Sequence, residues 1–524
     1  MWICRSGVIP YSAILLAGLT TAGQSRAEPF RVMSTQEATI ADLRAALMKK
    51  EVTCRQLVQA YIDRIEAYDR KGPTLNAIVM INPGALPAAD ALDQEFARTG
   101  ALRPLHCVPT IVKDNYDTND MPTSAGSLSL KGSTTATDAF IVRKLRDAGA
   151  VMLAKSNMAE FAWSPFETVG SLLPGYTHNP YALDRVPAGS SGGTAAAIAA
   201  NFGVIGLGTD TGNSIRGPSS HTSLVGIRST MGLTSRDGIV PLFLSRDIGG
   251  PMTRTVADAV AVFDLIAGTD PNDPITSEAD SKRPDIYLKF LDPAGLKGAR
   301  IGVLRQLMGA DTDPEIGKTL DQALNDMKSQ GAEIVDQIKV AEIDEIPVAK
   351  FFCNRFKHDI NAYLAKRNPP PPVKNLDEIM ATNKFHPSIE KRMRDAQAED
   401  PPDENPKCQE AAENGKKLAT GVLKAMDEGQ LDALVYPSWN NPPRLIGDLN
   451  TPHGNNSPRI SPPTGFPAIT VPMGFVRGGA LPAGLQILGR PWSEPTLIKI
   501  TYAYEQGTKH RRPPSSTPSL PGGL

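Results

Sequence analysis

Two stretches of the sequence, Pro187-Ala-Gly-Ser-Ser-Gly-Gly-Thr194 and Gly208-Thr-Asp-Thr-Gly-Asn-Ser-Ile-Arg-Gly-Pro218, carry glycine and serine at high density. Glycine lets the backbone adopt positive φ and brings N–H groups close to a bound atom. Serine supplies a hydroxyl that attacks a carbonyl or relays a proton. An alanine-rich helix over 194–200 and an apolar run over 204–207 separate the stretches. We predict two loops that meet in space and form an acyl-transfer site.

Amide hydrolysis requires a nucleophile and donors for the oxyanion, and the segment Asp210-Thr-Gly-Asn-Ser214 can supply both. A serine directly after a glycine-bearing turn presents its Oγ while neighbouring N–H groups converge on one point. Each such donor contributes about 3 kcal/mol in the transition state. Taken alone, a Gly/Ser turn more often marks a structural loop or an anion-binding nest, because glycine-rich loops are common in α/β folds.

The composition is that of an ordinary soluble globular protein. The chain has 524 residues, of which 41% are hydrophobic and 21% charged, so it has room for a large core. Its formal net charge of −1 gives no indication of a nucleic acid or an anionic membrane as partner.

Helices and strands alternate along the chain, which indicates an α/β architecture. Helices are expected at 39–50, 53–68, 88–98, 138–148, 194–200, 255–267, 314–330 and 495–508. Strands are expected at 105–112, 151–154, 300–304, 332–335, 431–436, 468–472 and 484–488. The strands at 105–112 and 151–154 flank a helix and predict a βαβ unit. Residues from about 270 to 430, with charged helices and proline runs, are expected to form a peripheral layer or insertion.

Residues 1–27 are predicted to be a signal peptide. Arg5 precedes an apolar stretch over 8–19, and Ser25-Arg-Ala27 offers small residues at the cleavage positions. Pro10 interrupts the stretch, which is too short to span a bilayer, so no stable membrane anchor is expected. We therefore expect an exported protein, periplasmic or secreted. Its formal charge changes from −1 to −3 when the two arginines of 1–27 are lost.

Four cysteines remain beyond the signal peptide: Cys54, Cys107, Cys353 and Cys408. In an oxidising compartment they allow three disulfide connectivities, among which the sequence does not choose. Four buried thiols are the favoured interpretation in a chain of this size. The spacing does not suit a zinc site.

Further motifs indicate a family. Val108-Pro-Thr-Ile-Val-Lys113-Asp-Asn and the two glycine-rich stretches resemble the three core motifs of the amidase signature family, in the family's order. Segments 249–258, 465–474 and 481–486 also resemble family segments, and the likeness is weakest over 276–430. The resemblance implies an α/β amidase-signature fold, in which helical layers sandwich a large mixed β-sheet. It implies one domain over 28–524, with a variable peripheral helical region at about 270–430.

The resemblance assigns a catalytic triad to Ser214, Ser190 and Lys113. Ser214 is expected to attack the amide carbonyl, and a cis-Ser190 to relay the proton to Lys113. Burial disfavours the lysine cation, so Lys113 is expected to be neutral and to act as the base. The scheme requires no histidine, metal or organic cofactor. The expected oxyanion hole consists of the backbone N–H groups of Thr211, Gly212, Asn213 and Ser214.

Family positions around the triad predict supporting roles. Ser191, Asp210 and Arg216 are expected to hold the loops by hydrogen bonds and by an Asp210–Arg216 ion pair. Asn213 stands where many members have glycine; asparagine tolerates a left-handed backbone, and its side chain is expected to narrow the pocket. Cys107 also stands where glycine is frequent and is interpreted as core packing.

Three other interpretations compete with this hydrolase. Gly189-Ser-Ser-Gly-Gly193 also fits a nucleophile elbow with Ser191 as nucleophile, but the segment before it, 184–187, is polar and contains a proline. That scheme also needs a downstream aspartate and histidine, and none of the histidines after the elbow has a recognisable context: His221, His358, His386, His453 and His510. A non-catalytic amide-binding homologue, in which Asn213 marks a degraded site, is the second reading.

A third reading is the A-type subunit of a tRNA-dependent amidotransferase, which shares these motifs. An exported chain meets neither partner subunits nor tRNA, and a charge of −3 does not favour RNA. Segments 234–241 and 492–505 instead resemble exported bacterial peptide amidases, which release ammonia from C-terminal carboxamides. Aryl acylamides, carbamates and esters remain open as substrates. The partner expected is a small or peptide amide, for a monomer or homodimer.

The substrate pocket is expected to draw on loops over 158–166 and 439–443. Trp163 and Trp439 lie in these loops, and packing in the core explains them equally well.

Overall fold

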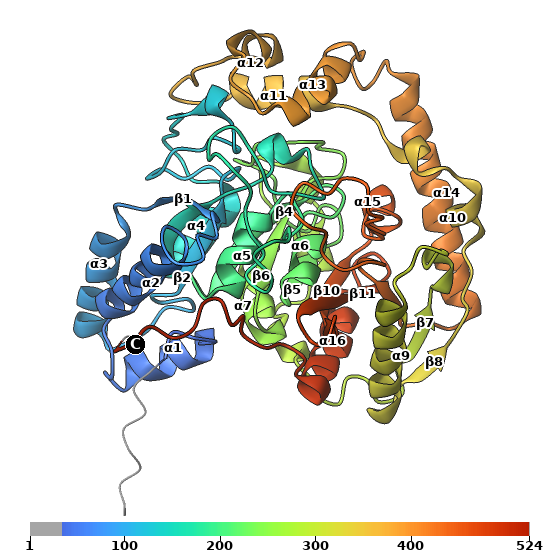
Figure 1. Cartoon of the computed structure of the whole chain (residues 1–524), viewed down its shortest axis with the longest axis horizontal. Helices are drawn as coiled ribbons and strands as arrows, with labels where there is room; N and C mark the ends of the chain where they lie inside the picture. The colour runs from blue at the N-terminus through green and yellow to red at the C-terminus, as the bar shows by residue number, and fades with distance from the viewer. Residues whose placement is uncertain (1–33, 523) are drawn as a thin grey trace, which may run out of the picture.

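The computed structural model describes residues 34–522 and 524, so the predicted signal peptide lies outside the described residues. Eleven strands form one mixed sheet in the order β1-β3-β2-β4-β6-β5-β10-β11-β9-β7-β8 (Figure 1). In that order their bounds are β1 (Ile78–Ile81), β3 (Val151–Ser156), β2 (Pro109–Lys113), β4 (Ile205–Asp210), β6 (Ile248–Thr253), β5 (Val225–Arg228), β10 (Ala468–Val476), β11 (Leu481–Leu488), β9 (Ala433–Pro437), β7 (Arg300–Val303) and β8 (Glu333–Val335).

The described residues contain sixteen α-helices. These are α1 (Ile40–Met48), α2 (Cys54–Tyr68), α3 (Ala85–Thr99), α4 (Phe140–Asp147), α5 (Gly192–Ala199), α6 (Arg216–His221), α7 (Val256–Ile266), α8 (Ala279–Lys282), α9 (Pro314–Ser329), α10 (Ala341–Glu345), α11 (Phe356–Ala365), α12 (Leu376–Thr382), α13 (Glu390–Gln397), α14 (Pro406–Glu428), α15 (Ser461–Thr464) and α16 (Glu494–Thr508). The predicted mixed α/β fold is confirmed.

The connections around β2 place helices on both faces of the sheet. The strands β3, β2 and β4 are parallel neighbours, with β2 in the middle. The chain runs from β2 to β3 through α4, and then returns across β2 to β4 through α5. Right-handed crossovers in opposite directions put their helices on opposite faces. The predicted βαβ unit at β2-α4-β3 is therefore confirmed, and the reversal creates a crevice at the carboxyl ends of β2 and β4, where ligands bind in such sheets.

Local sequence signals explain several helix starts. The Thr53 side chain accepts the Gln56 N–H while the Gln56 side chain accepts the Thr53 N–H, so the predicted capping box at the start of α2 is confirmed. Thr39 and Asp42 form a second box at α1. Thr255 caps α7.

Some strands differ from the expectation. β2 begins at Pro109, not at residue 105, and β1, β5 and β6 had no clear strand signal. β6 reads Ile-Gly-Gly-Pro-Met-Thr, a composition typical of a turn. A Cβ at Gly249 would lie 2.6 Å from the Tyr116 hydroxyl, and one at Gly250 would lie 2.4 Å from the Ile227 carbonyl. Close approach between β6 and its neighbours therefore requires these glycines.

The region over 270–430 is divided between the sheet and an outer layer. β7 and β8 pair in parallel with each other, and β7 pairs with β9 at the edge of the sheet. The helices α11, α12 and α13 form an arc over the rest of the molecule (Figure 1). The buried side chains of Phe356 and Met393 on this arc belong to one apolar cluster with Phe161 and Trp163 of the main body. We call residues 341–428 the helical wall.

All four cysteines form disulfides, which corrects the expectation of four thiols. Cys54 is bonded to Cys107, and Cys353 to Cys408. Cys107 has a φ of 65°, a left-handed conformation that explains why glycine suits this position. Cys107 is buried, as expected, but as half of a disulfide between α2 and the segment before β2 and not as a packing thiol.

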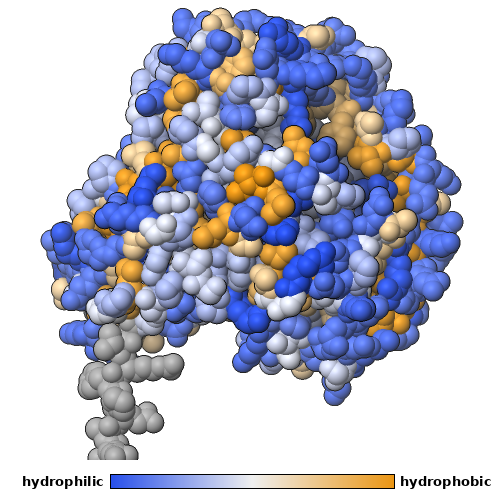
Figure 2. Space-filling model, viewed as in Figure 1, coloured by the Kyte–Doolittle hydropathy of each residue, from blue (hydrophilic) through white to orange (hydrophobic). Residues whose placement is uncertain are grey.

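Hydrophilic side chains predominate on the face in Figure 2, and a recess separates the arc of the helical wall from the body. In the part of the chain that the structure describes, no helix is long and apolar enough to cross a membrane.

Candidate active site

Lys113 is the last residue of β2 and is fully buried. Its Nζ lies 2.8 Å from the Ser190 Oγ and 2.7 Å from the Thr209 Oγ1. Burial lowers the pKa of Lys113 to about 7, although the carboxylates of Asp247 and Asp210 oppose this shift. A large fraction of the amine is therefore neutral near pH 7 and able to accept a proton.

Ser190 follows a cis peptide bond from Gly189, in the loop before α5. Gly189 has no room for a side chain, because a Cβ would lie 2.4 Å from the Glu167 carbonyl and 2.5 Å from the Ser164 carbonyl. Close approach of this loop to the 164–167 segment directs the Ser190 hydroxyl towards Lys113.

Ser214 lies on the wall of a cavity of about 590 Å³, in the loop after β4. Its exposed fraction is 5%, whereas Ser190 and Lys113 are completely buried. Among the described residues, no hydrogen bond joins the Ser214 hydroxyl to Ser190. The structure thus brings the three predicted triad residues to one edge of the sheet and forms the Lys113–Ser190 link.

The predicted oxyanion segment, 211–214, also lines this cavity. A Cβ at Gly212 would have its nearest neighbour, the Pro458 Cβ, at 3.9 Å, so the backbone here is open to the cavity. The Thr211 hydroxyl donates to the Asp247 carboxylate at 2.5 Å. The segment therefore borders the space in which a substrate carbonyl would lie, and its role as the oxyanion hole stays a prediction.

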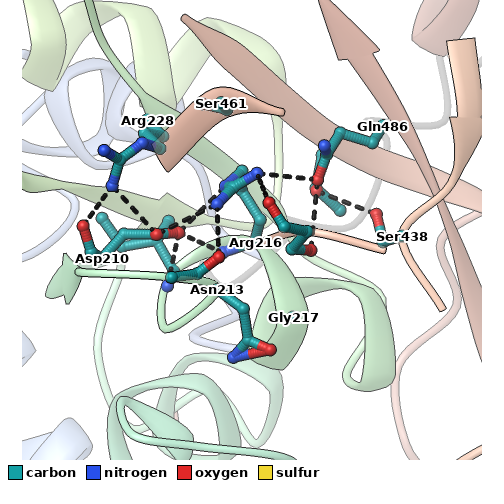
Figure 3. Close-up of polar contacts among 12 residues, drawn as sticks. Asp210, Asn213, Arg216, Gly217, Arg228, Ser438, Ser461 and Gln486 are labelled. Carbon is teal, nitrogen blue, oxygen red and sulfur yellow. Dashed lines mark hydrogen bonds and ion pairs between the residues drawn. The ribbon is translucent and has the colours of Figure 1, made fainter. Parts of the chain in front are cut away.

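An ionic network holds the loop after β4 (Figure 3). The buried Asp210 carboxylate pairs with Arg216 at 3.0 Å and with Arg228 at 3.1 Å. Burial raises the pKa of Asp210, but the two guanidinium groups overcome this effect and lower it to about 2. Arg216 also donates to the carbonyl groups of Gly212 and Ser457, each at 2.8 Å. The expected Asp210–Arg216 pair is therefore present, and Arg228 is a second partner that the sequence did not reveal.

Ser191 binds the backbone of β4. Its hydroxyl accepts the Thr209 N–H and donates to the Thr209 carbonyl, each at 3.3 Å. Ser191 is fully buried and is not among the residues that line the cavity. This arrangement fits a supporting side chain and does not favour the nucleophile elbow.

Asn213 connects the two glycine-rich loops, which the sequence did not predict. Its Nδ2 donates to the Gly189 carbonyl at 2.6 Å, and its Oδ1 accepts from the Asn455 side chain at 2.5 Å. Asn213 is 1% exposed and is not among the residues with positive φ, so its tolerance of a left-handed backbone is not used. A glycine here would remove the only side chain that reaches from this loop to the carbonyl before Ser190, among the described residues.

Thr209 and Asp247 are site residues that sequence reasoning missed. Thr209 accepts from Lys113 and, at 3.1 Å, from Asn115. Asp247 receives the Thr211 hydroxyl and the Leu242 N–H, and burial raises its pKa to about 6. Thr209 lies within the second glycine-rich stretch and Asp247 two residues before the 249–258 segment, and these positions were the available signals.

The aromatic residues divide between the cavity and the core. Trp163 lines the cavity and packs edge-to-face on Phe243. Trp439 does not line it and stacks on His221 at 4.5 Å. The expected contribution from 158–166 is therefore confirmed for 162–166, whereas the contribution from 439–443 is wrong, because residues 453–459 of the following loop take that place.

Within the described residues, no group of three or more His, Cys, Asp and Glu side chains is arranged to hold a metal ion. His221 is buried, and burial lowers its pKa to about 3, so it is neutral.

A mixed sheet that brings a buried lysine and two serine loops together defines an enzyme class, the amide-bond hydrolases. Residues 56–498 match the Amidase family, and the chain belongs to this family. It is 35% identical over 525 residues to a probable amidase of Arabidopsis thaliana, with 96% of each chain covered. It is 34% identical over 503 residues to the A-type subunit of glutamyl-tRNA(Gln) amidotransferase of Moorella thermoacetica, covering 91% of this chain and 98% of the relative.

The fold is also similar to solved structures. The native peptide amidase of Stenotrophomonas maltophilia superposes with a TM-score of 0.80 at 36% identity, covering 91% of this chain and 98% of that one. A peptide amidase in complex with the competitive inhibitor chymostatin superposes with a TM-score of 0.79, also at 36% identity, covering 91% of this chain and 99% of that one.

Proposed function

We propose that this chain hydrolyses the C–N bond of a carboxamide, including the C-terminal amide of a peptide, and releases ammonia. The contact that carries the proposal is the 2.8 Å hydrogen bond between the Lys113 Nζ and the Ser190 Oγ. Asn213, the neighbour of the cavity-lining Ser214, binds the Gly189 carbonyl in the same loop as Ser190. The likeness to a peptide amidase at 36% identity supports the carboxamide substrate.

The proposed reaction has two halves. The Ser214 Oγ attacks the carbonyl carbon while its proton passes to Ser190 and a proton of Ser190 passes to Lys113. The N–H groups of 211–214 stabilise the oxyanion. The relay then protonates the leaving nitrogen, the C–N bond breaks, and ammonia departs from an acyl-Ser214 ester. Water attacks this ester through the same relay, releases the carboxylic acid and restores Ser214.

A substrate panel tests this proposal on the purified full-length chain. Carboxamides, anilides, carbamates and esters are compared, with ammonia and amine release measured separately. We expect ammonia from carboxamides, with turnover insensitive to chelators. Preferred turnover of anilides, carbamates or esters would move the assignment to another substrate class of the family. No turnover of any of these compounds, or chelator-sensitive turnover, would contradict the proposal.

The likeness to the A-type subunit of the amidotransferase, at 34% identity, supports a second candidate. Hydrolysis of a free carboxamide by the chain alone, without partner subunits, distinguishes the amidase from this candidate. We further propose that residues 1–27 are removed during export. Mass spectrometry of the exported protein tests this cleavage, and an intact N-terminus on a protein retained in the cell would contradict it.

A further inference from the structure

The cavity next to Ser214 is positively charged. Arg392 and Arg459 are its only charged lining residues within the described chain, and no aspartate or glutamate is among them. His453 also lines it, and burial lowers the pKa of this imidazole, so it carries no charge at neutral pH. The formal net charge of the whole chain is −1, so this excess of positive charge is local to the cavity.

Arg392 has no acidic partner within ion-pair distance in the part of the chain described. It lies on α13, where the neighbouring cations are paired: Lys391 with Asp395 at 2.8 Å, and Arg394 with Glu390 at 2.5 Å. Arg392 instead donates one N–H to the Trp163 carbonyl. This contact anchors the half-buried side chain at the cavity and leaves donors of its guanidinium group for a ligand.

Arg459 lines the same cavity from the loop that precedes α15. It follows Pro458, which faces Gly212 of the predicted oxyanion segment. One guanidinium nitrogen donates to the Ile343 carbonyl at 3.1 Å. Asp344 raises the pKa of Arg459 against the dominant lowering effect of burial, but this carboxylate is too far away to form an ion pair.

Most of the remaining lining surface of the cavity is apolar. Trp163, Phe166, Leu242, Phe243, Val348 and Phe352 line the same space. Apolar surface of this kind favours a bulky hydrophobic group, whereas a guanidinium group binds a carboxylate through two parallel hydrogen bonds.

We propose that Arg392 and Arg459 select substrates in which a carboxylate accompanies an aromatic or large aliphatic group, an inference that rests on the proposed function. The carboxylate belongs either to the acyl part or to the leaving amine. In both positions the carboxylate meets the same guanidinium donors, so substrates that carry it at only one position are needed to distinguish them.

Two matched pairs of substrates test the proposal. N-succinyl-phenylalaninamide against N-acetyl-phenylalaninamide adds a carboxylate to the acyl part, with ammonia as the product. N-benzoylglycine against N-ethylbenzamide adds one to the leaving amine, with amine release as the readout. We expect kcat/KM to be about tenfold or more higher for the anionic member of one pair, the usual scale for a hydrogen bond to a charged group, and to fall with ionic strength.

Variants assign this preference to the arginines. Arg392→Gln and Arg459→Gln are each expected to reduce kcat/KM for the anionic substrate about tenfold, mainly through KM, with less than about a twofold change for its neutral partner. Arg392→Lys should restore part of the loss. Arg394→Gln, on the same helix but paired with Glu390, is the control and should leave the ratio unchanged.

Equal turnover of both members of both pairs, or equal losses for anionic and neutral substrates in the arginine variants, would overturn the proposal. Those outcomes leave amide hydrolysis itself intact. Failure of the proposed function looks different, because none of the four amides is then hydrolysed by a folded enzyme.

Discussion

The two sides of the cavity are built in different ways. On the core side, buried polar groups bind one another directly: Lys113 to Ser190, Asp210 to two arginines, and Asn213 to the Gly189 carbonyl. On the other side, the helical wall contributes apolar side chains, a disulfide and Arg392, which has no acidic partner among the residues described. A buried polar network tolerates little change, because each group left unpaired costs free energy. The comparison assigns the chemistry to the core side and the choice of substrate to the helical wall together with Arg459.

The largest effect is expected at Ser214. Ser214→Ala removes the proposed nucleophile and should reduce kcat by about 10⁴-fold or more, as measured by ammonia release. Its hydroxyl has no hydrogen-bond partner among the described residues, so the melting temperature should change little. Ser191→Ala is the matched control, and we expect it to reduce stability more than chemistry. If Ser191→Ala loses turnover and Ser214→Ala retains it, the nucleophile is Ser191 and the proposed role of Ser214 is wrong.

The next effect concerns Lys113 and pH. Because the pKa of Lys113 is lowered to about 7, its cation dominates below pH 7 and cannot accept the proton. We expect kcat/KM to rise through about pH 7 and to stay high on the alkaline side. Lys113→Met should reduce turnover by several orders of magnitude. A rate that falls above pH 7 in the wild-type enzyme would contradict a lysine base.

Lys113 has a linked effect on stability. The unfolded lysine has a pKa of 10.5, so between about pH 7 and 10.5 the unfolded chain binds a proton that the folded chain does not. Its contribution therefore makes the folded state more stable as pH rises through this window. Urea unfolding of wild type and Lys113→Met across the window isolates that slope, which the variant should lack.

A third effect tests the charge of Asp210 separately from the volume of its side chain on the core side. Asp210→Asn keeps the volume but leaves Arg216 and Arg228 without their buried counterion. Breaking a buried ion pair in this way costs about 3–5 kcal/mol of folding free energy, which chemical denaturation measures. Arg305→Gln, whose partners Asp321 and Asp336 are exposed, serves as the control with a change below about 1 kcal/mol. Equal changes in the two variants would remove the energetic distinction between the buried network and the surface.

The sequence predicted the core side far better than the helical wall. Lys113, Ser190 and Ser214 all lie in short motifs: Lys113 ends β2, Ser214 follows β4, and Ser190 precedes the helix α5 that leads into β4. The strand order brings the ends of β2 and β4 together. Thr209 was missed because its role appears only when β2 and β4 pair, and Asp247 because its partner Thr211 is 36 residues away. Arg392 reaches the Trp163 carbonyl across 229 residues, and no local pattern reports such a contact.

The disulfides were unpredictable for a related reason, since spacing does not choose among pairings. β6 was missed because its Gly-Gly-Pro reads as a turn, although tight packing against Tyr116 and Ile227 makes those glycines suitable for a strand. Local composition therefore failed where contacts distant in sequence decide the conformation.

The smallest effect on activity is expected when each of the two disulfides is removed in turn and the two variants are compared. They close loops of similar length, with sequence separations of 53 and 55, so each should stabilise the fold to a similar extent, by about 4 kcal/mol in the chain-entropy view. Cys353 lines the cavity, whereas the Cys54–Cys107 bond lies between α2 and the segment before β2. Cys353→Ser with Cys408→Ser should therefore raise KM a few-fold at nearly constant kcat, because the wall beside Phe352 loosens. Cys54→Ser with Cys107→Ser should lower the melting temperature without that change in KM. If both pairs alter KM alike, the helical wall has no special part in substrate binding, and the two sides of the cavity differ in construction alone.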